Sequence, residues 1–377
     1  MPGATVPAQD AREPGEAMTT ETAAQFTVSF TRYIDADGHP TGPLPDFAAP
    51  PANLLPLYRA MVLTRTFDAK AVALQRTGRL GTFASSLGQE AVGVGAASAM
   101  APGDVLLPSF RDQSAQLWRG VTPLELLLYW GGDERGSDFA GPREDFPISV
   151  PVAAHAPHAA GVALAFALRK EKRASVCILG DGATSKGDFY EAINMAGPWH
   201  LPMVMVVNNN QWAISVPRAA QTAAATLAQK AIAAGIPGEQ VDGNDFVAVR
   251  DAVARALARA REGGGATLVE AITYRLSDHT TADDARRYRD DKAVSARWHG
   301  EPLARLRAYL VSQGAWSRED EEHALAEATT AVEQASEAYL ATPPQPPAAM
   351  FDHLFAELPP SIRAQRAQAL GLEAPDA

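Results

Sequence analysis

The sequence of 377 residues contains one cysteine, Cys177, so no intrachain disulfide can form and no thiolate metal cluster can be built. It contains no run of eighteen apolar residues, which argues against a membrane-spanning helix. The N-terminus lacks the basic start and apolar core of a secretory signal. We therefore expect a soluble protein of the cytoplasm.

Basic residues are also in short supply. There are 33 Lys and Arg against 44 Asp and Glu, which gives a net charge of −11 and argues against a nucleic-acid binder. The two nucleotide-binding glycine motifs, G-x-G-x-x-G after a strand and G-x-x-x-x-G-K-[ST], are missing as well. With 46% hydrophobic and 20% charged residues, the chain has the composition of a globular protein.

The pattern along the chain predicts three parts. Residues 1–50 are rich in Pro, Gly, Ala and acids with little periodicity and predict an extended N-terminal arm, in which only 26–33 could form a short strand. Residues 51–345 carry the apolar periodicity of a domain, including a helix after Ser317 and Asp320, which form a variant capping box. Residues 346–377 are predicted to be a C-terminal tail.

The centre of the chain predicts an α/β fold. The short apolar runs 175–180 and 203–208 are separated by a helical segment at 187–196. Two strands buried on both faces and joined by one helix form a parallel strand-helix-strand unit. Residues 269–273 look like another strand of the same parallel sheet, which helices would flank on both faces.

Both central strands end in residues suited to a metal and a phosphate. The first ends in Gly180-Asp181-Gly182 and the second in Asn208-Asn209-Asn210, with 26 residues between Gly182 and Asn209. The carboxyl ends of neighbouring parallel strands meet at one edge of a sheet, where Asp181 and Asn210 could share a magnesium ion. The glycines allow close approach to a diphosphate, and Ala183 could lend its N–H. Each motif alone is better explained as a turn or loop cap, but the pair at this spacing favours a metal site.

The surrounding sequence resembles the alpha subunits of the thiamine-diphosphate-dependent pyruvate and branched-chain 2-oxoacid dehydrogenases. The resemblance runs from about residue 57 to about residue 314. It is carried by the segments LGQEAVGVGAA, LLPSFRDQ, GDGATSKGDFYEAINMAGPWHLPMVMVVNNNQWAIS, TLAQKAIAAGIPGEQVDGND and EAITYRLSDHTTADDARRYRD. It implies a thiamine-diphosphate-binding fold, with thiamine diphosphate and Mg²⁺ as cofactors.

The resemblance also implies roles for residues at the diphosphate. Asp181 and Asn210 would bind Mg²⁺ together with the backbone carbonyl of Trp212. Arg111 and Asn208 would face the diphosphate, and a surface ion pair with Asp112 is the second interpretation of Arg111.

Further roles concern the rings and the substrate. Phe110 stands where the family usually has tyrosine, which puts a hydroxyl contact in doubt. Ser149, Val150 and Val152 match the segment that lines the thiazolium, with Val152 holding the cofactor bent. His279 is the candidate catalytic residue, since histidine can donate to a substrate oxygen and exchange protons near neutral pH, although a lone loop histidine is more often only solvated. The loop framework would include these residues: Asp283, Asp284, Tyr288 and Arg289. Thr280 sits where mitochondrial relatives carry a phosphorylated serine, but nothing in the sequence supports a kinase switch here.

The family activates its cofactor with a glutamate that, in two-chain members, belongs to the beta subunit. The resemblance therefore implies a chain that is inactive alone and works as a heterotetramer of two alpha and two beta subunits, which decarboxylates a small 2-oxoacid and passes the acyl unit to a lipoyl-bearing acyltransferase. Residues 221–245 resemble bacterial pyruvate dehydrogenases more closely, which favours pyruvate. A branched-chain or acetoin-cleaving enzyme, a catalytically silent assembly subunit and a magnesium-dependent nucleotide-binding protein remain as alternatives.

Overall fold

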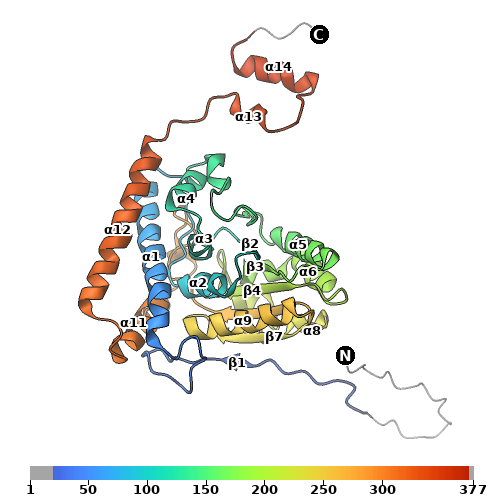
Figure 1. The fold of residues 1–377 in the computed structure, drawn as a ribbon, viewed down its shortest axis with the longest axis vertical. Helices are drawn as coiled ribbons and strands as arrows, with labels where there is room; N and C mark the ends of the chain where they lie inside the picture. The colour runs from blue at the N-terminus through green and yellow to red at the C-terminus, as the bar shows by residue number, and fades with distance from the viewer. Residues whose placement is uncertain (1–19, 373–377) are drawn as a thin grey trace, which may run out of the picture.

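A computed structural model describes residues 20–372 and contains a six-stranded sheet in which every paired neighbour is parallel. The strand order is β1-β7-β8-β4-β3-β2 (Figure 1). The strands are β1 (Phe30–Thr31), β2 (Val105–Leu107), β3 (Ser175–Gly180), β4 (Met203–Asn209), β7 (Gly238–Asp242) and β8 (Thr267–Ile272). The predicted α/β fold with a parallel sheet is confirmed.

Helices cover both faces of this sheet, as predicted, because alternate strand residues point to opposite sides. On one face, α5 (His155–Arg169) and α6 (Gly187–Ala196) bury Phe166 and Phe189 against the sheet. On the other face, α2 (Glu90–Ala99) and α9 (Phe246–Arg261) do the same through Val92 and Val253 (Figure 1). The packing of α2 against α9 is close, since a Cβ on Gly95 would lie 2.9 Å from a Val249 methyl group.

A further layer of long helices packs beside α2. It consists of α1 (Leu55–Arg76), α11 (Pro302–Ser312) and α12 (Arg318–Ala341), and Figure 1 shows α12 running along α1. The ring of Tyr58 meets that of Trp316 edge to face at 5.2 Å. The predicted capping box of Ser317 and Asp320 begins α12.

Shorter elements connect these layers. The helices are η1 (Pro51–Leu54), α3 (Gln113–Arg119), α4 (Pro123–Trp130), η2 (Glu134–Ser137), η3 (Asp181–Ser185), α7 (Arg218–Gln221), α8 (Lys230–Ala233), η4 (Ala285–Arg287), α10 (Asp291–Arg297), α13 (Ala349–Asp352) and α14 (Pro360–Ala369). The strands β5 (Trp212–Ala213) and β6 (Val216–Pro217) form a two-stranded antiparallel hairpin.

The two ends of the chain differ in how they meet this body. The strand expected within residues 26–33 forms only at β1, an edge strand whose one neighbour is β7. Ile34 and Ala48 of the predicted arm are buried in the layer of α1 and α11, whereas α13 and α14 stand away from the sheet (Figure 1). The boundaries at residues 50 and 345 stay predictions, and residues 1–19 of the arm and 373–377 of the tail lie outside the described residues. Among residues 20–372, no helix is both long enough and apolar enough to cross a membrane.

Candidate cofactor and active site

The two polar strand ends lie side by side because β3 and β4 are parallel neighbours. Gly180 pairs with Asn208 in the register of these strands, so Asp181 and Asn210 leave the sheet at the same edge. Both side chains are buried, with 2% of Asp181 and 6% of Asn210 exposed. The structure therefore brings the two motifs together in space.

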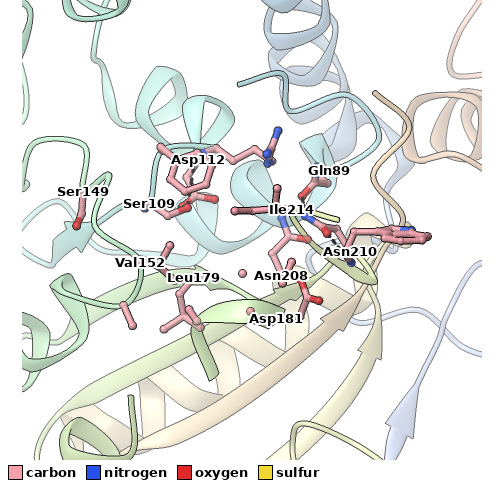
Figure 2. A pocket seen from close by; sticks show the side chains of 18 of the residues that line it. Gln89, Ser109, Asp112, Ser149, Val152, Leu179, Asp181, Asn208, Asn210 and Ile214 are labelled. Atoms are coloured by element: carbon pink, nitrogen blue, oxygen red, sulfur yellow. Dashed lines mark hydrogen bonds between the residues drawn. The ribbon is translucent and has the colours of Figure 1, made fainter. Parts of the chain in front are cut away.

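A cavity of about 190 Å³ opens at this edge of the sheet (Figure 2). Its lining includes these residues singled out from the sequence: Phe110, Arg111, Val152, Gly180, Asp181, Gly182, Ala183, Asn208, Asn210, Trp212 and His279. Val150 is outside this lining and 53% exposed, although its neighbour Ser149 belongs to it.

The oxygen-rich end of the cavity suits a hard cation. Among the described residues Asp181 forms no ion pair, and its carboxylate accepts one side-chain hydrogen bond, from Gln221 Nε2 at 2.8 Å. Burial raises the pKa of Asp181, and a bound cation would offset that cost. The Asn210 amide donates to Gln89 Oε1 at 3.0 Å, which leaves Oδ1 facing the Trp212 N–H at 3.2 Å with a lone pair to spare. A carboxylate, an amide oxygen and a backbone carbonyl are ligands that Mg²⁺ accepts.

The glycines beside Asp181 leave space that a side chain would fill. A Cβ on Gly182 would lie 2.6 Å from the Cβ of Ala213 in the β5–β6 hairpin, which is closer than two carbons can approach. A Cβ on Gly180 would meet nothing within 4 Å and would extend into open space. Asn208 is held beside them by the Thr273 hydroxyl, which donates to its Oδ1 at 2.7 Å.

Arg111 brings a positive charge to the same cavity. Its guanidinium donates to the carbonyl oxygens of Ser85 and His279, the latter at 2.8 Å. The carboxylate of Asp112 accepts from Ser109 N and Oγ at 2.7 Å instead, so the alternative of an Arg111–Asp112 surface ion pair is wrong. Burial lowers the pKa of Arg111 to about 10, which still leaves it charged at neutral pH.

His279 lies between two guanidinium groups. Its Nδ1 is 3.2 Å from Arg111 Nη2 and 3.4 Å from Arg275 Nη1. Because guanidinium nitrogens only donate, Nδ1 must accept and the ring proton must sit on Nε2. Burial, followed by the charges of Arg111 and Arg275, lowers the pKa of His279 to about 4. At neutral pH the ring is therefore uncharged and can offer a hydrogen bond from Nε2.

The loop that carries His279 is braced by its own polar residues. Asp283 accepts from the His279 N–H at 3.0 Å and from the Tyr288 hydroxyl. Arg275, whose side chain is fully buried, donates to the Tyr288 hydroxyl at 2.9 Å, and Arg289 donates to the Arg275 carbonyl. Asp284 differs, since it is only half-buried and pairs with Arg286.

Several lining or supporting residues were not predicted from the sequence. Gln89 is 2% exposed, orients Asn210 and has an unpartnered Nε2. Arg275 contacts His279, and Nε2 of His155 donates to the Ile178 carbonyl at 2.8 Å. The carbonyl accepts, so the proton is on Nε2 and the unpartnered Nδ1 of His155 is an acceptor. Gln89 and Arg275 lie in segments that carry the family resemblance, and His155 lies in α5. No sequence motif indicates a role for any of the three.

Comparison with known proteins settles the family. The family model described as "Dehydrogenase E1 component" matches residues 58–348. The chain belongs to this family. It is 43% identical over 320 residues to the 3-methyl-2-oxobutanoate dehydrogenase subunit alpha of Mycobacterium tuberculosis, covering 85% of this chain and 87% of the relative.

Two further relatives carry another substrate name. The pyruvate dehydrogenase E1 component subunit alpha of Acholeplasma laidlawii is 40% identical, covering 84% of this chain and 92% of the relative. The subunit of the same name from Bacillus subtilis is 38% identical, with coverages of 83% and 85%. The predicted likeness to alpha subunits of thiamine-diphosphate-dependent 2-oxoacid dehydrogenases is confirmed, and with it a thiamine diphosphate enzyme that works with a beta subunit.

Proposed function

We propose that this chain is the alpha subunit of the acetyl-transferring pyruvate dehydrogenase. It would act in the cytoplasm as a heterotetramer with two beta subunits, decarboxylate pyruvate oxidatively and pass the acyl unit to a lipoyl-bearing acyltransferase. The observation that carries the proposal is the pairing of Asp181 and Asn210 at the buried edge between β3 and β4, above a cavity. The domain that holds the cofactor would be residues 51–345.

The chain's own residues then have distinct tasks. Asp181, Asn210 and the Trp212 carbonyl would hold Mg²⁺, which would bind the diphosphate, and Gly180, Gly182 and Ala183 would give the phosphates access to the backbone. Arg111 supplies a positive charge, and Asn208 a side-chain amide, on the diphosphate side.

Thiamine diphosphate, when bound, supplies the nucleophilic carbon and the electron sink for decarboxylation. Val152, with Phe110 nearby, would provide an apolar surface for its rings, and the exposed Val150 would add to that surface outside the cavity. His279 donates a hydrogen bond from Nε2 to a substrate oxygen, which stabilises negative charge that develops there.

A branched-chain 2-oxoacid is the second candidate substrate. The 43% identity to a 3-methyl-2-oxobutanoate dehydrogenase subunit favours it, and Val152, Leu179 and Ile214 form an apolar part of the cavity lining. Such a surface accepts an aliphatic side chain as readily as a methyl group, and one methylene changes the preference by only about 10- to 200-fold.

The test is to co-express the chain with its beta subunit and to assay the assembly with pyruvate and 3-methyl-2-oxobutanoate. We expect thiamine-diphosphate-dependent decarboxylation with a higher kcat/KM for pyruvate. A higher kcat/KM for the branched acid would keep the mechanism and replace the substrate. No decarboxylation of either acid, together with no cofactor binding, would instead support a catalytically silent assembly subunit.

A further inference from the structure

Backbone strain is concentrated beside the cavity. Within residues 20–372, five residues other than glycine have a positive φ: Ala153, Lys170, His200, Gln211 and Ile214. Ala153 and Ile214 line the cavity, and Gln211 lies between Asn210 and Trp212. Ile214, with φ at +56°, is the only β-branched member of this set, and such a residue is a genuine outlier in this region.

The position of Ile214 in its hairpin makes the strain more marked. Trp212 pairs with Pro217 and Ala213 with Val216, so Ile214 and Ser215 are the two central residues of the turn. Only the first has a positive φ, which is the pattern of a type II′ turn, and that place normally belongs to glycine. A left-handed conformation costs a residue with a Cβ about 1–2 kcal/mol.

No contact with the described residues 20–372 compensates for this strain by burying the side chain. Ile214 is 57% exposed, so the fold gains little from its apolar surface. The carbonyl of Ile214, by contrast, is fixed, because Arg275 Nη2 donates to it at 2.9 Å. The side chain itself lines the cavity near Asn208 and Asn210 (Figure 2). A residue that is both strained and exposed, yet held in place at a cavity, has the features of a functional position.

We propose that Ile214 is a specificity-determining residue whose side chain contacts the aliphatic part of the 2-oxoacid and limits its size. The inference rests on the proposed function. Arg275 bonds both the Ile214 carbonyl and, at 3.4 Å, His279 Nδ1. One buried guanidinium thus sets the distance between the Ile214 side chain and the hydrogen-bond donor of His279. The substrate would therefore be bound at its apolar end by Ile214 and at its polar end by His279.

The experiment compares Ile214→Ala and Ile214→Gly with wild type in the co-expressed assembly. Val216→Ala is the matched control, since Val216 is an exposed apolar residue of the same hairpin that is not among the lining residues. The measurements are kcat/KM for pyruvate and for 3-methyl-2-oxobutanoate, the thiamine diphosphate Kd and the midpoint of thermal unfolding.

We expect both Ile214 variants to shift the ratio of the two kcat/KM values about tenfold toward the larger acid, since the space taken by the side chain opens. The thiamine diphosphate Kd should stay unchanged. Ile214→Gly should unfold at no lower temperature than wild type, because glycine relieves the strained φ. Val216→Ala should change none of these quantities.

A constant ratio would overturn the inference. Combined with a raised thiamine diphosphate Kd, it would make Ile214 a cofactor contact, and combined with a lower unfolding midpoint for Ile214→Gly, a structural one. If wild type decarboxylates the acids while the ratio stays constant, this inference alone fails. If wild type decarboxylates neither acid, the proposed function fails and the inference falls with it.

Discussion

The protonation of His279 depends on Arg275, and Arg275→Met tests that dependence. The ordinary pKa of 6.5 is lowered to about 4 by burial and by the guanidinium groups of Arg111 and Arg275. Burial is the largest of these causes and Arg275 the smallest, so the variant's pKa should rise above about 4 but stay below its ordinary value. At any pH between about 4 and 6, a larger fraction of His279 would then be protonated in the variant than in wild type.

The assay is the pH dependence of kcat/KM in the co-expressed assembly. Wild type should show no ionisation of His279 above pH 5, because the ring is already neutral there. Arg275→Met should show a fall in kcat/KM that begins at a higher pH on the acid side. Arg275→Lys, which keeps a positive charge near the ring, should leave the acid side as in wild type even if the overall rate drops.

The lowered pKa of His279 should also make the free energy of unfolding depend on pH. Between pH 6.5 and about 4, the unfolded chain takes up a proton at His279 that the folded chain refuses. The folded state therefore loses stability as the pH falls through this window, and Arg275→Met should reduce that loss.

The control for charge removal is Arg286→Met, because Arg286 belongs to the same loop but is exposed and pairs with Asp284. This control should show the wild-type pH profile. A pH profile for Arg275→Met that matches wild type, with only a uniformly lower rate, would refute the assignment of Arg275 as a group that sets the protonation of His279.

Three other substitutions test separate parts of the site and the fold. Gln89→Met removes the acceptor that orients the Asn210 amide at 3.0 Å. We expect this variant to raise the apparent Kd for Mg²⁺ in thiamine diphosphate binding roughly 10- to 100-fold. An unchanged Kd would show that Asn210 needs no such support. Gly182→Ala places a Cβ 2.6 Å from that of Ala213, so we expect it to abolish cofactor binding in calorimetry. The control is Gly187→Ala, whose new Cβ would have no atom within 4 Å, and this variant should bind the cofactor as wild type does. Asp245→Ala removes the cap of α9 and the acceptor for the N–H groups of Tyr33 and Ile34 at 2.6 and 2.8 Å. We expect this variant to lower the free energy of unfolding, measured by urea titration, by about 3 kcal/mol. A loss below about 1 kcal/mol would contradict the role given to this carboxylate.

The sequence predicted the parts of the site that depend on local pattern. The apolar runs of β3 and β4 indicate buried strands, and parallel neighbours bring Gly180-Asp181-Gly182 and Asn208-Asn209-Asn210 to one edge. Residues such as Gln89 and Arg275 escaped prediction because their roles arise where distant elements meet. Gln89 precedes α2, 121 residues from its partner Asn210.

Ile214 shows a second limit of sequence patterns. Isoleucine is common in strands and cores, so its residue type does not predict a turn position with a positive φ at the edge of a cavity. The sequence indicated a strand somewhere within residues 26–33, and β1 covers only Phe30–Thr31. Composition alone does not show which residues of a segment pair with a neighbouring strand.

The most direct test of the central claim is calorimetric titration of the co-expressed assembly with thiamine diphosphate, with Mg²⁺ present and with Mg²⁺ removed by a chelator. Wild type should bind only with Mg²⁺, and Asp181→Ala should lose binding. Asp188→Ala, which alters a half-buried carboxylate in the first turn of α6, should bind as wild type does. Binding by Asp181→Ala at wild-type affinity, or equal binding without Mg²⁺, would contradict the assignment of this sheet edge as the magnesium and diphosphate site.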